Sequence, residues 1–242
     1  MWNTLRKTRL SLQNAGLLRT AQRVVQRSVP AWLFDFNSLI AMENDLTGGG
    51  FSPESGEWPH RWAEENDLEL LTRGGLSADE VRSFWDQDGR AALCTKNGRL
   101  ITYTWYLPGG CKVFGWLRIV GDRQMYSTAT YVAPEFRGRR IHSQTRYFAY
   151  SALADLGYTS IVAFIEFLNR SALRAGQGGI RRYIGQLTYW RLLGLVIYRL
   201  NSKWRFGFWN MRRPLDLSFD DFDRENFRLI HKDARSGLDN GA

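Results

Sequence analysis

Hydrophobic and polar positions between residues 124 and 169 predict a strand, a basic turn, a helix and a second strand in succession. The first strand runs from Met125 to Val132, where β-branched and aromatic residues dominate, and Pro134 ends it because proline has no backbone N–H. After the turn, apolar side chains recur at helical spacing (Ile141, Phe148, Ala152 and Leu156). Gly157 follows where a helix C-cap glycine is expected. The second strand, Ser160 to Phe167, is apolar almost throughout, as expected of a strand buried on both faces.

Shorter patterns predict further elements ahead of this stretch. Apolar runs predict strands over Trp32 to Met42 and over Leu68 to Leu71. Ser77 opens a capping-box sequence and a helix that continues to about Trp85. Asn97-Gly98 is a strong hairpin signal, and it joins two predicted strands (Ala91 to Thr95 and Leu100 to Leu107).

Three more elements are predicted around the central stretch. Val113 to Ile119 reads as an inserted strand, and a short helix is expected after Asn169, ahead of a glycine-rich break. Ile180 to Trp190 and Leu192 to Leu200 then predict a closing antiparallel pair of strands.

The loop from Thr47 to Pro59 is rich in Gly, Pro and Ser and is the clearest boundary in the chain. Four segments follow from these patterns: a basic amphipathic helical extension (1–30), an extra strand with an acidic Gly/Pro-rich loop (31–66), a core (67–200) and a C-terminal tail (201–242).

Composition indicates a globular chain in a reducing compartment. Of 242 residues, 44% are hydrophobic and 14% aromatic, which excludes a disordered protein. Cys94 and Cys111 are the only cysteines, so neither a disulfide framework nor a zinc site is expected, and a cytoplasmic location fits best. We expect no membrane-spanning run, no signal peptide and no bound metal.

Charge is distributed unevenly along the chain. The formal net charge is +9, but residues 1–42 carry six Lys/Arg and one Asp, whereas residues 43–88 carry three Arg and twelve Asp/Glu. Residues 1–29 contain no acidic residue, and their apolar positions fall at helical spacing. This segment is either a helix packed on the domain or a peripheral contact with the anionic inner face of a membrane, and we favour the membrane contact.

The basic turn has the chemistry of an anion site. A helix N-terminus presents unpaired N–H groups and a partial positive charge, which suits a pyrophosphate. Arg137, Arg139 and Arg140 add positive charge around it, and Gly138 allows a left-handed backbone or a close approach. The alternative is that these arginines are simply solvated, but the strand–turn–helix context favours anion binding.

The stretch from Val132 to Ile141, Val-Ala-Pro-Glu-Phe-Arg-Gly-Arg-Arg-Ile, resembles the acyl-CoA signature of the GNAT acetyltransferase superfamily. The segment Asn169-Arg170-Ser171-Ala172-Leu173 is similar to the Asn-x-x-Ala/Ser segment of that family. The resemblance covers roughly residues 67–200. Two positions depart from the family pattern, because Arg140 replaces its second glycine and His142 its third small residue.

This resemblance implies an α/β (α+β) fold with a mixed central sheet that is splayed at the cofactor strand, flanked here by N- and C-terminal extensions. It implies acetyl-CoA or another acyl-CoA as co-substrate and direct acyl transfer to an amine. The backbone at Tyr131 and Val132 would polarise the thioester. The other cofactor-binding positions that it implies are Arg137, Gly138, Arg139, Arg140, Ile141, His142 and Asn169.

Residues for proton transfer are harder to identify. Glu166 ends the second strand and is the candidate general base, although a carboxylate paired with an arginine is the alternative. Among the histidines, we expect His142 to contact phosphate or cap the helix, and His60, in the acidic loop, is a weaker candidate for a residue that faces the acceptor. The position of the family's thiol-protonating tyrosine is Gly176 here, which leaves Tyr183 as the nearest substitute or direct transfer with water as the acid.

Other functions stay open at this point. The first alternative is a non-catalytic module of this fold that binds an anionic membrane surface or nucleic acid. If the protein is an enzyme, we do not expect it to bind nucleic acid. A transferase that uses aminoacyl-tRNA is disfavoured, because a core of about 130 residues is small for it. The sequence does not identify the acceptor; we expect a small-molecule or sugar amine, and the acidic segment favours a cationic one.

Overall fold

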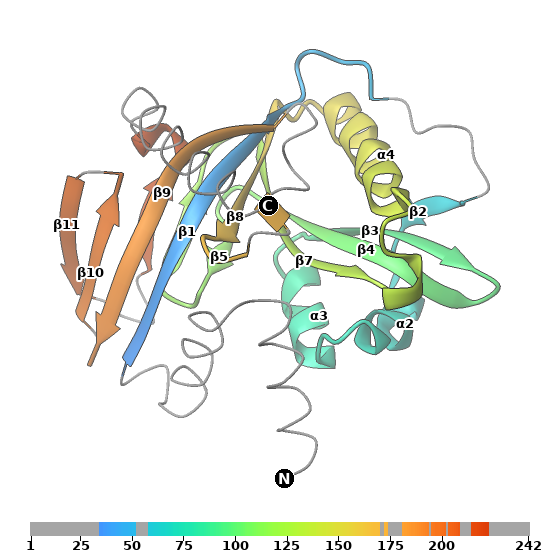
Figure 1. The fold of residues 1–242 in the computed structure, drawn as a ribbon, viewed down its shortest axis with the longest axis horizontal. Helices are drawn as coiled ribbons and strands as arrows, with labels where there is room; N and C mark the ends of the chain where they lie inside the picture. Colours follow the sequence, from blue (N-terminus) through green and yellow to red (C-terminus); the bar gives the residue numbers. More distant parts are fainter. Residues whose placement is uncertain are drawn as a thin grey trace, which may run out of the picture. The chain divides into compact units, whose positions relative to one another are not determined.

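The computed structural model describes residues 34–51, 58–169, 172–173, 181–193, 195–201, 203–208 and 214–222 (Figure 1). Contacts gather these residues into two compact units. Unit 1 draws on residues 34–42, 112–118 and 164–222, and unit 2 on residues 43–111 and 119–163. The predicted helical segment 1–30 and position 176 lie outside the described residues.

Unit 2 contains a mixed sheet in the strand order β8-β7-β4-β3-β2. Its strands are β2 (His60–Trp62), β3 (Arg90–Lys96), β4 (Arg99–Pro108), β7 (Gln124–Val132) and the first part of β8 (Ser160–Glu166). All neighbours are antiparallel except β7 and β8, which are parallel. The predicted Asn97-Gly98 hairpin is confirmed as the β3–β4 connection, where both residues have a positive φ.

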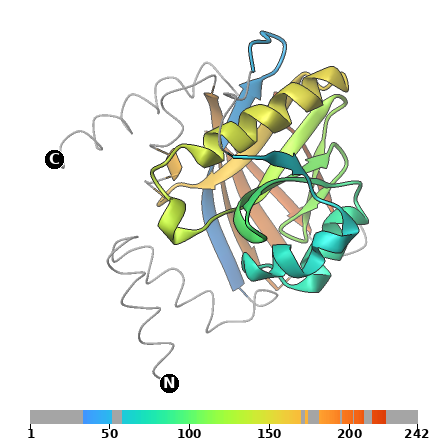
Figure 2. The same ribbon diagram turned by 90° about the vertical axis from the view of Figure 1, so that its right-hand side faces the viewer.

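Helices cover both faces of this sheet. Because side chains alternate along a strand, Ala92 and Tyr106 pack with α4 (Ile141–Asp155), whereas Leu93 and Trp105 pack with α2 (Leu68–Arg73) and α3 (Ala78–Trp85). Figures 1 and 2 show α4 on one side of these strands and the two shorter helices on the other. The capping box that was expected at Ser77 is present, with Glu80 as its partner.

The predicted strand at Leu68 to Leu71 is wrong, because these residues begin α2. A short 3-10 turn, η1 (Glu65–Asp67), precedes the helix, and Glu64 and Asp67 form a capping box around it. Leu68 and Leu71, three residues apart, pack into the same hydrophobic cluster, which is a helical spacing. A run this short does not distinguish a strand from a helix, and the contacts decided it.

Unit 1 contains the strands β1 (Phe34–Asp45), β9 (Arg181–Leu192), β10 (Leu195–Leu200) and β11 (Lys203–Phe208), in the order β11-β10-β9-β1. The predicted antiparallel pair at 180–200 is confirmed as β9 and β10, and the predicted strand at 32–42 corresponds to β1. Strand β11 in the tail was not predicted. Both β1 and β8 contribute residues to each unit.

A smaller sheet has the order β12-β6-β5, from β12 (Leu215–Ser218), β6 (Leu117–Val120) and β5 (Lys112–Val113). The single strand predicted over Val113 to Ile119 is therefore wrong, because the chain turns back at Phe114 and Gly115, which both have a positive φ. A 3-10 turn, η3 (Phe219–Asp221), follows β12. No helix in the part of the chain that the structure describes is long and apolar enough to cross a membrane.

Candidate active site

Strand β7 separates from its parallel neighbour β8 halfway along its length. The ladder between them joins Gln124 to Ser160 and ends at the pair Ser127 and Ala163, although β7 continues to Val132. The cause is a register shift against β4 next to Ala129, which has a φ of 42° and interrupts the regular pleat. The predicted splay of the cofactor strand is thus present.

The backbone of the last β7 residues has a defined direction. The Ala133 N–H donates to the Ile101 carbonyl at 2.8 Å, on the β4 side. Because backbone groups alternate along a strand, the Val132 N–H points away from β4 and the Tyr131 N–H toward it. Of the two predicted backbone donors, Val132 is therefore the one that is directed away from the sheet pairing.

The turn after β7, where the anion site is predicted, contains two residues with a left-handed backbone conformation. A 3-10 turn, η2 (Pro134–Phe136), leads to Gly138 with a φ of 79°, and a Cβ at Gly138 would have no heavy atom within 4 Å. Arg140 is the N-cap of α4 and also has a left-handed backbone, with a φ of 59°. Such a conformation costs a non-glycine residue about 1 kcal/mol. Arg140 thus has a backbone conformation that glycine adopts without steric cost.

Charged side chains surround this turn. Arg137 donates through Nε to the Val132 carbonyl at 3.3 Å, and the Arg139 guanidinium lies 5.6 Å from the Phe136 ring centroid. Arg99 and Glu135 form an exposed ion pair at 2.8 Å. The first turn of α4 contains no acidic residue. Helix geometry leaves the N–H groups of its first residues without an acceptor inside the helix, so the turn favours a bound anion.

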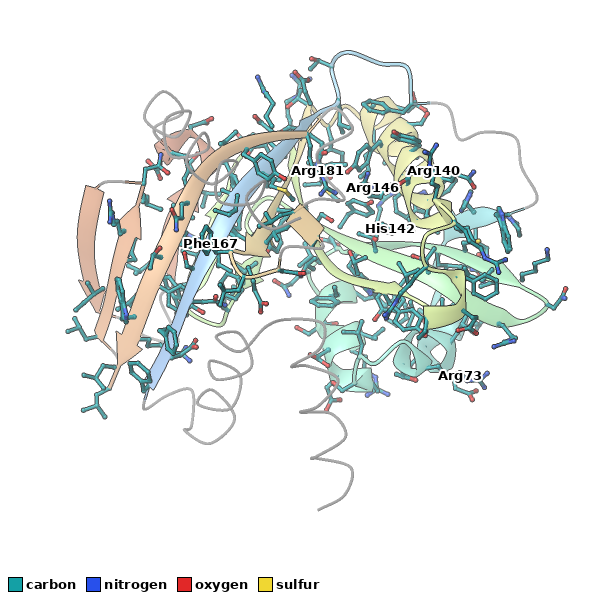
Figure 3. The ribbon with its side chains drawn as sticks, in the orientation of Figure 1. Arg73, Arg140, His142, Arg146, Phe167 and Arg181 are labelled. Carbon is teal, nitrogen blue, oxygen red and sulfur yellow. The ribbon has the colours of Figure 1, made fainter. Side chains whose placement is uncertain are left out.

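His142 is held by a buried threonine. The hydroxyl of Thr102, which is fully buried, donates to the Tyr131 carbonyl at 2.6 Å and lies 3.4 Å from His142 Nδ1. Since the only hydroxyl proton goes to the carbonyl, the threonine oxygen is left to accept a hydrogen bond from Nδ1 of His142. Figure 3 labels His142 together with Arg140 and Arg146 along α4. Thr102 was not identified from the sequence, because nothing local marks it.

His60 occupies strand β2 rather than a loop. Its Nδ1 lies 3.1 Å from the hydroxyl of Thr145 on α4, and its ring stacks 6.3 Å from that of Phe148. Burial lowers the pKa of His60, which keeps the ring neutral. These contacts place His60 between β2 and α4.

Three further candidates lie in unit 1. Glu166 ends β8, and its carboxylate contributes, after burial and Asp35, to a raised pKa of Tyr189. Asn169 accepts from the Ala172 N–H through its side chain at 3.4 Å, so it caps the turn that follows. The Tyr183 hydroxyl donates to the Leu173 carbonyl at 2.7 Å.

The neighbourhood of Glu166 is a polar network that the sequence did not reveal. The Tyr189 hydroxyl donates to Asp35 at 3.1 Å, and Asp35 pairs with Arg191 at 3.6 Å, with both of these charged side chains largely buried. Within the described residues, no group of three or more His, Cys, Asp and Glu side chains is arranged to hold a metal ion.

No family model matches the sequence. No curated protein matches it either. Solved structures do match: a GNAT-family acetyltransferase from Novosphingobium aromaticivorans has a TM-score of 0.50 at 14% identity, over 70% of this chain and 68% of that one.

Two other matching structures are a conserved protein of unknown function from Staphylococcus epidermidis and the GNAT-family N-acetyltransferase YhbS from Escherichia coli in complex with CoA. The first has a TM-score of 0.45 and 11% identity over 69% of this chain and 65% of that one. The second has a TM-score of 0.35 and 19% identity over 44% of this chain and 61% of that one. The chain thus spans about two thirds of the length of the first structures that it matches. The mixed sheet, the splayed β7 and the Novosphingobium match together show that this protein has the GNAT acyltransferase fold.

Proposed function

We propose that this protein transfers an acetyl or other acyl group from acyl-CoA directly to an amine. The observation that carries the proposal is the sequence of features from β7 to α4. The strand leaves its parallel partner after Ser127, and the Val132 N–H turns away from β4. The chain then enters a left-handed arginine–glycine turn that caps a helix.

Each feature has a role in the reaction. The α4 N-terminus, Gly138 and the three arginines (Arg137, Arg139 and Arg140) bind the pyrophosphate of CoA. The Val132 N–H donates to the thioester oxygen, where negative charge develops as the amine nitrogen attacks the carbonyl carbon. The C–S bond then breaks, the amine gives up its proton, and the CoA thiolate leaves.

Glu166 is the proposed general base. It lies in unit 1 with the buried Tyr189–Asp35–Arg191 network, and its negative charge helps to raise the pKa of Tyr189. Tyr183 donates its proton to a backbone carbonyl, so we assign water, not Tyr183, as the source of the proton for the thiolate.

Charge and cysteine chemistry support the proposed acceptor and compartment. Residues 43–88 carry twelve acidic residues against three arginines, which favours a cationic small-molecule or sugar amine. Cys94 and Cys111 are both buried and unpaired, in agreement with a cytoplasmic location.

The test is binding followed by turnover. Acetyl-CoA should raise the melting temperature, because a ligand that binds only the folded state stabilises it. Glu166→Gln should lower turnover of an amine acceptor about 100-fold at neutral pH and leave that thermal shift unchanged. Unchanged turnover in the variant would return Glu166 to a structural role. If millimolar acetyl-CoA leaves the melting temperature unchanged, the protein is not an acyl-CoA-dependent enzyme.

A second candidate is a non-catalytic binding module with the same fold. Arg140 and His142, which stand where the family that the chain resembles has small residues, favour it. A thermal shift with acetyl-CoA and no acetylation of any amine in an acceptor library would select this module.

A further inference from the structure

Tyr131 carries a hydroxyl that the described part of the chain leaves without a hydrogen-bond partner. The residue stands near the end of β7, directly before Val132, whose N–H is the proposed donor to the thioester oxygen. Its side chain packs with the hydrophobic cluster of α2 and α3, on the face of the sheet opposite to α4, and is half-buried. Among the described residues, the Tyr131 hydroxyl neither forms a hydrogen bond nor counts among the fully buried polar atoms. It is therefore accessible to a ligand.

The ring of Tyr131 is held in place by a second tyrosine. Tyr103 lies directly opposite on β4, and the two rings stack with centroids 5.6 Å apart and planes inclined by 23°. Tyr103 is itself fixed, because its side chain is buried and its hydroxyl donates to the Gly74 carbonyl at 3.3 Å. A Cβ at Gly74 would collide with the Tyr103 ring, so this close approach requires a glycine after α2. The Tyr131 ring thus rests on a rigid support.

A fixed negative charge acts on this tyrosine pair. Burial raises the pKa of Tyr103 to about 12, and the charge of Glu80 contributes to the rise. The exposed Glu80 carboxylate is held at the start of α3 by the Ser77 N–H and hydroxyl, at 2.8 and 2.9 Å. An aromatic face and a carboxylate both attract a cation, and a phenolic oxygen accepts a hydrogen bond from an ammonium group. The Tyr131 side chain therefore suits a positively charged group.

The positive charge at this position does not belong to the nitrogen that is acylated. That nitrogen must be uncharged, because it attacks the carbonyl carbon with its lone pair. Surroundings that favour an ammonium group would oppose the loss of its proton and slow the attack. They bind a second ammonium group of the same molecule without this penalty. Since Tyr131 is the neighbour of Val132, consecutive Cα atoms being about 3.8 Å apart, this second group lies close to the thioester.

We propose that Tyr131 is a specificity-determining residue that selects an acceptor with two amino groups. Its ring and hydroxyl bind the ammonium group that does not react, while the other amino group, uncharged, attacks the thioester carbon. This inference rests on the proposed acyl transfer and adds the class of acceptor to it.

The test compares the full-length natural sequence with Tyr131→Phe. The acceptors are linear diamines of increasing length, each matched with the linear monoamine of the same length. The natural sequence should prefer the diamine in kcat/KM. Tyr131→Phe keeps the ring and its stacking on Tyr103 but removes the oxygen, so this preference should fall about tenfold, the effect of losing a hydrogen bond to a charged group. The loss should appear mainly as a higher KM for the diamine, because the ammonium group is bound equally before and during the transfer.

Matched variants control for the hydroxyl and for the charge. Tyr147→Phe removes the hydroxyl of a half-buried tyrosine on α4, at the other face of the sheet, and should not change the preference for the diamine. Glu80→Gln retains a capping-box residue but removes its charge, so the preference should fall about twofold, as expected of an exposed charge. Asp79→Asn neutralises the neighbouring carboxylate, which pairs with Arg82 at 3.3 Å, and should leave the preference unchanged.

Binding measured apart from turnover distinguishes this inference from the proposed reaction. Calorimetric titration with the diamines in the presence of CoA requires no acyl transfer. Diamine binding that Tyr131→Phe weakens, without acylation of any amine, would support the site at Tyr131 and contradict the reaction. Acylation with the same diamine preference in Tyr131→Phe and the natural sequence would overturn the inference and leave the reaction intact. A natural sequence that neither binds the diamines nor prefers them to the monoamines would overturn it as well.

Discussion

Two of the turns that hold a large side chain on a left-handed backbone, among the described residues, present side chains of opposite chemistry. At the start of α4, Arg140 has a φ of 59° beside the left-handed Gly138. At the β9–β10 connection, Leu193 has a φ of 47°. The backbone cost is similar, about 1 kcal/mol each. One turn presents a permanent positive charge and the other an exposed aliphatic group, so strain of one kind accompanies two side chains of opposite chemistry.

Not every left-handed residue has this meaning. Asp88, Asn97 and Asn201 belong to residue types that tolerate the conformation, and Ala129 interrupts the pleat of β7. Arg123, with a φ of 60°, lies exposed before β7, and nothing in the structure assigns it a ligand. Strain is therefore informative only together with a second feature, such as a helix N-terminus or a cluster of exposed apolar side chains.

The largest effect is expected when the arginine turn loses its glycine. Gly138→Val places a β-branched residue at a φ of 79°, where the backbone must change although the added side chain has room. Acyl transfer should fall about 100-fold or more, and the thermal shift with acetyl-CoA should disappear, because the N–H groups that face the pyrophosphate are misplaced.

The control for this change is Gly98→Val in the β3–β4 hairpin. Gly98 has a φ of 72° and equally open space, so the backbone cost is matched. If both variants lose activity to the same extent, the loss reports general destabilisation and not an anion site.

A smaller effect separates charge from strain at Arg140. Arg140→Gly removes the strain and one guanidinium, so the protein should become about 1 kcal/mol more stable while acetyl-CoA binds about tenfold more weakly. Arg123→Gly relieves the same strain and should leave acetyl-CoA binding unchanged. Tighter binding by Arg140→Gly would mean that the arginine crowds the phosphates. Chemical denaturation and calorimetric titration measure the two quantities.

Salt should test the contribution of charge at the arginine turn. Raising ionic strength from about 50 to about 500 mM should weaken acetyl-CoA binding several-fold, because exposed arginine–phosphate interactions are screened.

The smallest expected effect concerns the two cysteine thiols, which should stay unreactive in every folded variant. Their lack of labelling therefore checks that each variant is folded. Burial raises the pKa of Cys94 to about 11 and that of Cys111 to about 12. The neutral thiol therefore persists through neutral pH, and thiolate, the reactive form, appears only as the pH approaches these values. Iodoacetamide at pH about 7.5 should label neither cysteine in the natural protein or in the variants. Labelling of a variant alone would mean that its unit 2 has opened.

The amino-acid sequence by itself determined the stretch from β7 to β8 and the chemistry of its turn. Pro134 ends the strand, Gly138 and Gly157 adopt positive φ values, and apolar residues repeat at helical spacing between them. These signals are local, because each acts on the backbone within a few residues of itself. The α3 capping box and the β3–β4 hairpin were predicted for the same reason.

Tertiary structure decided what those local signals leave open. It made Leu68–Arg73 a helix, divided residues 113–119 between β5 and β6, and added β11. It also brought Thr102 to the Tyr131 carbonyl and to His142, across sequence separations of 29 and 40 residues. A short apolar run is compatible with either a strand or a helix. A buried hydroxyl forms its hydrogen bond only after distant strands have paired. Those choices depend on long-range packing, which local periodicity does not encode.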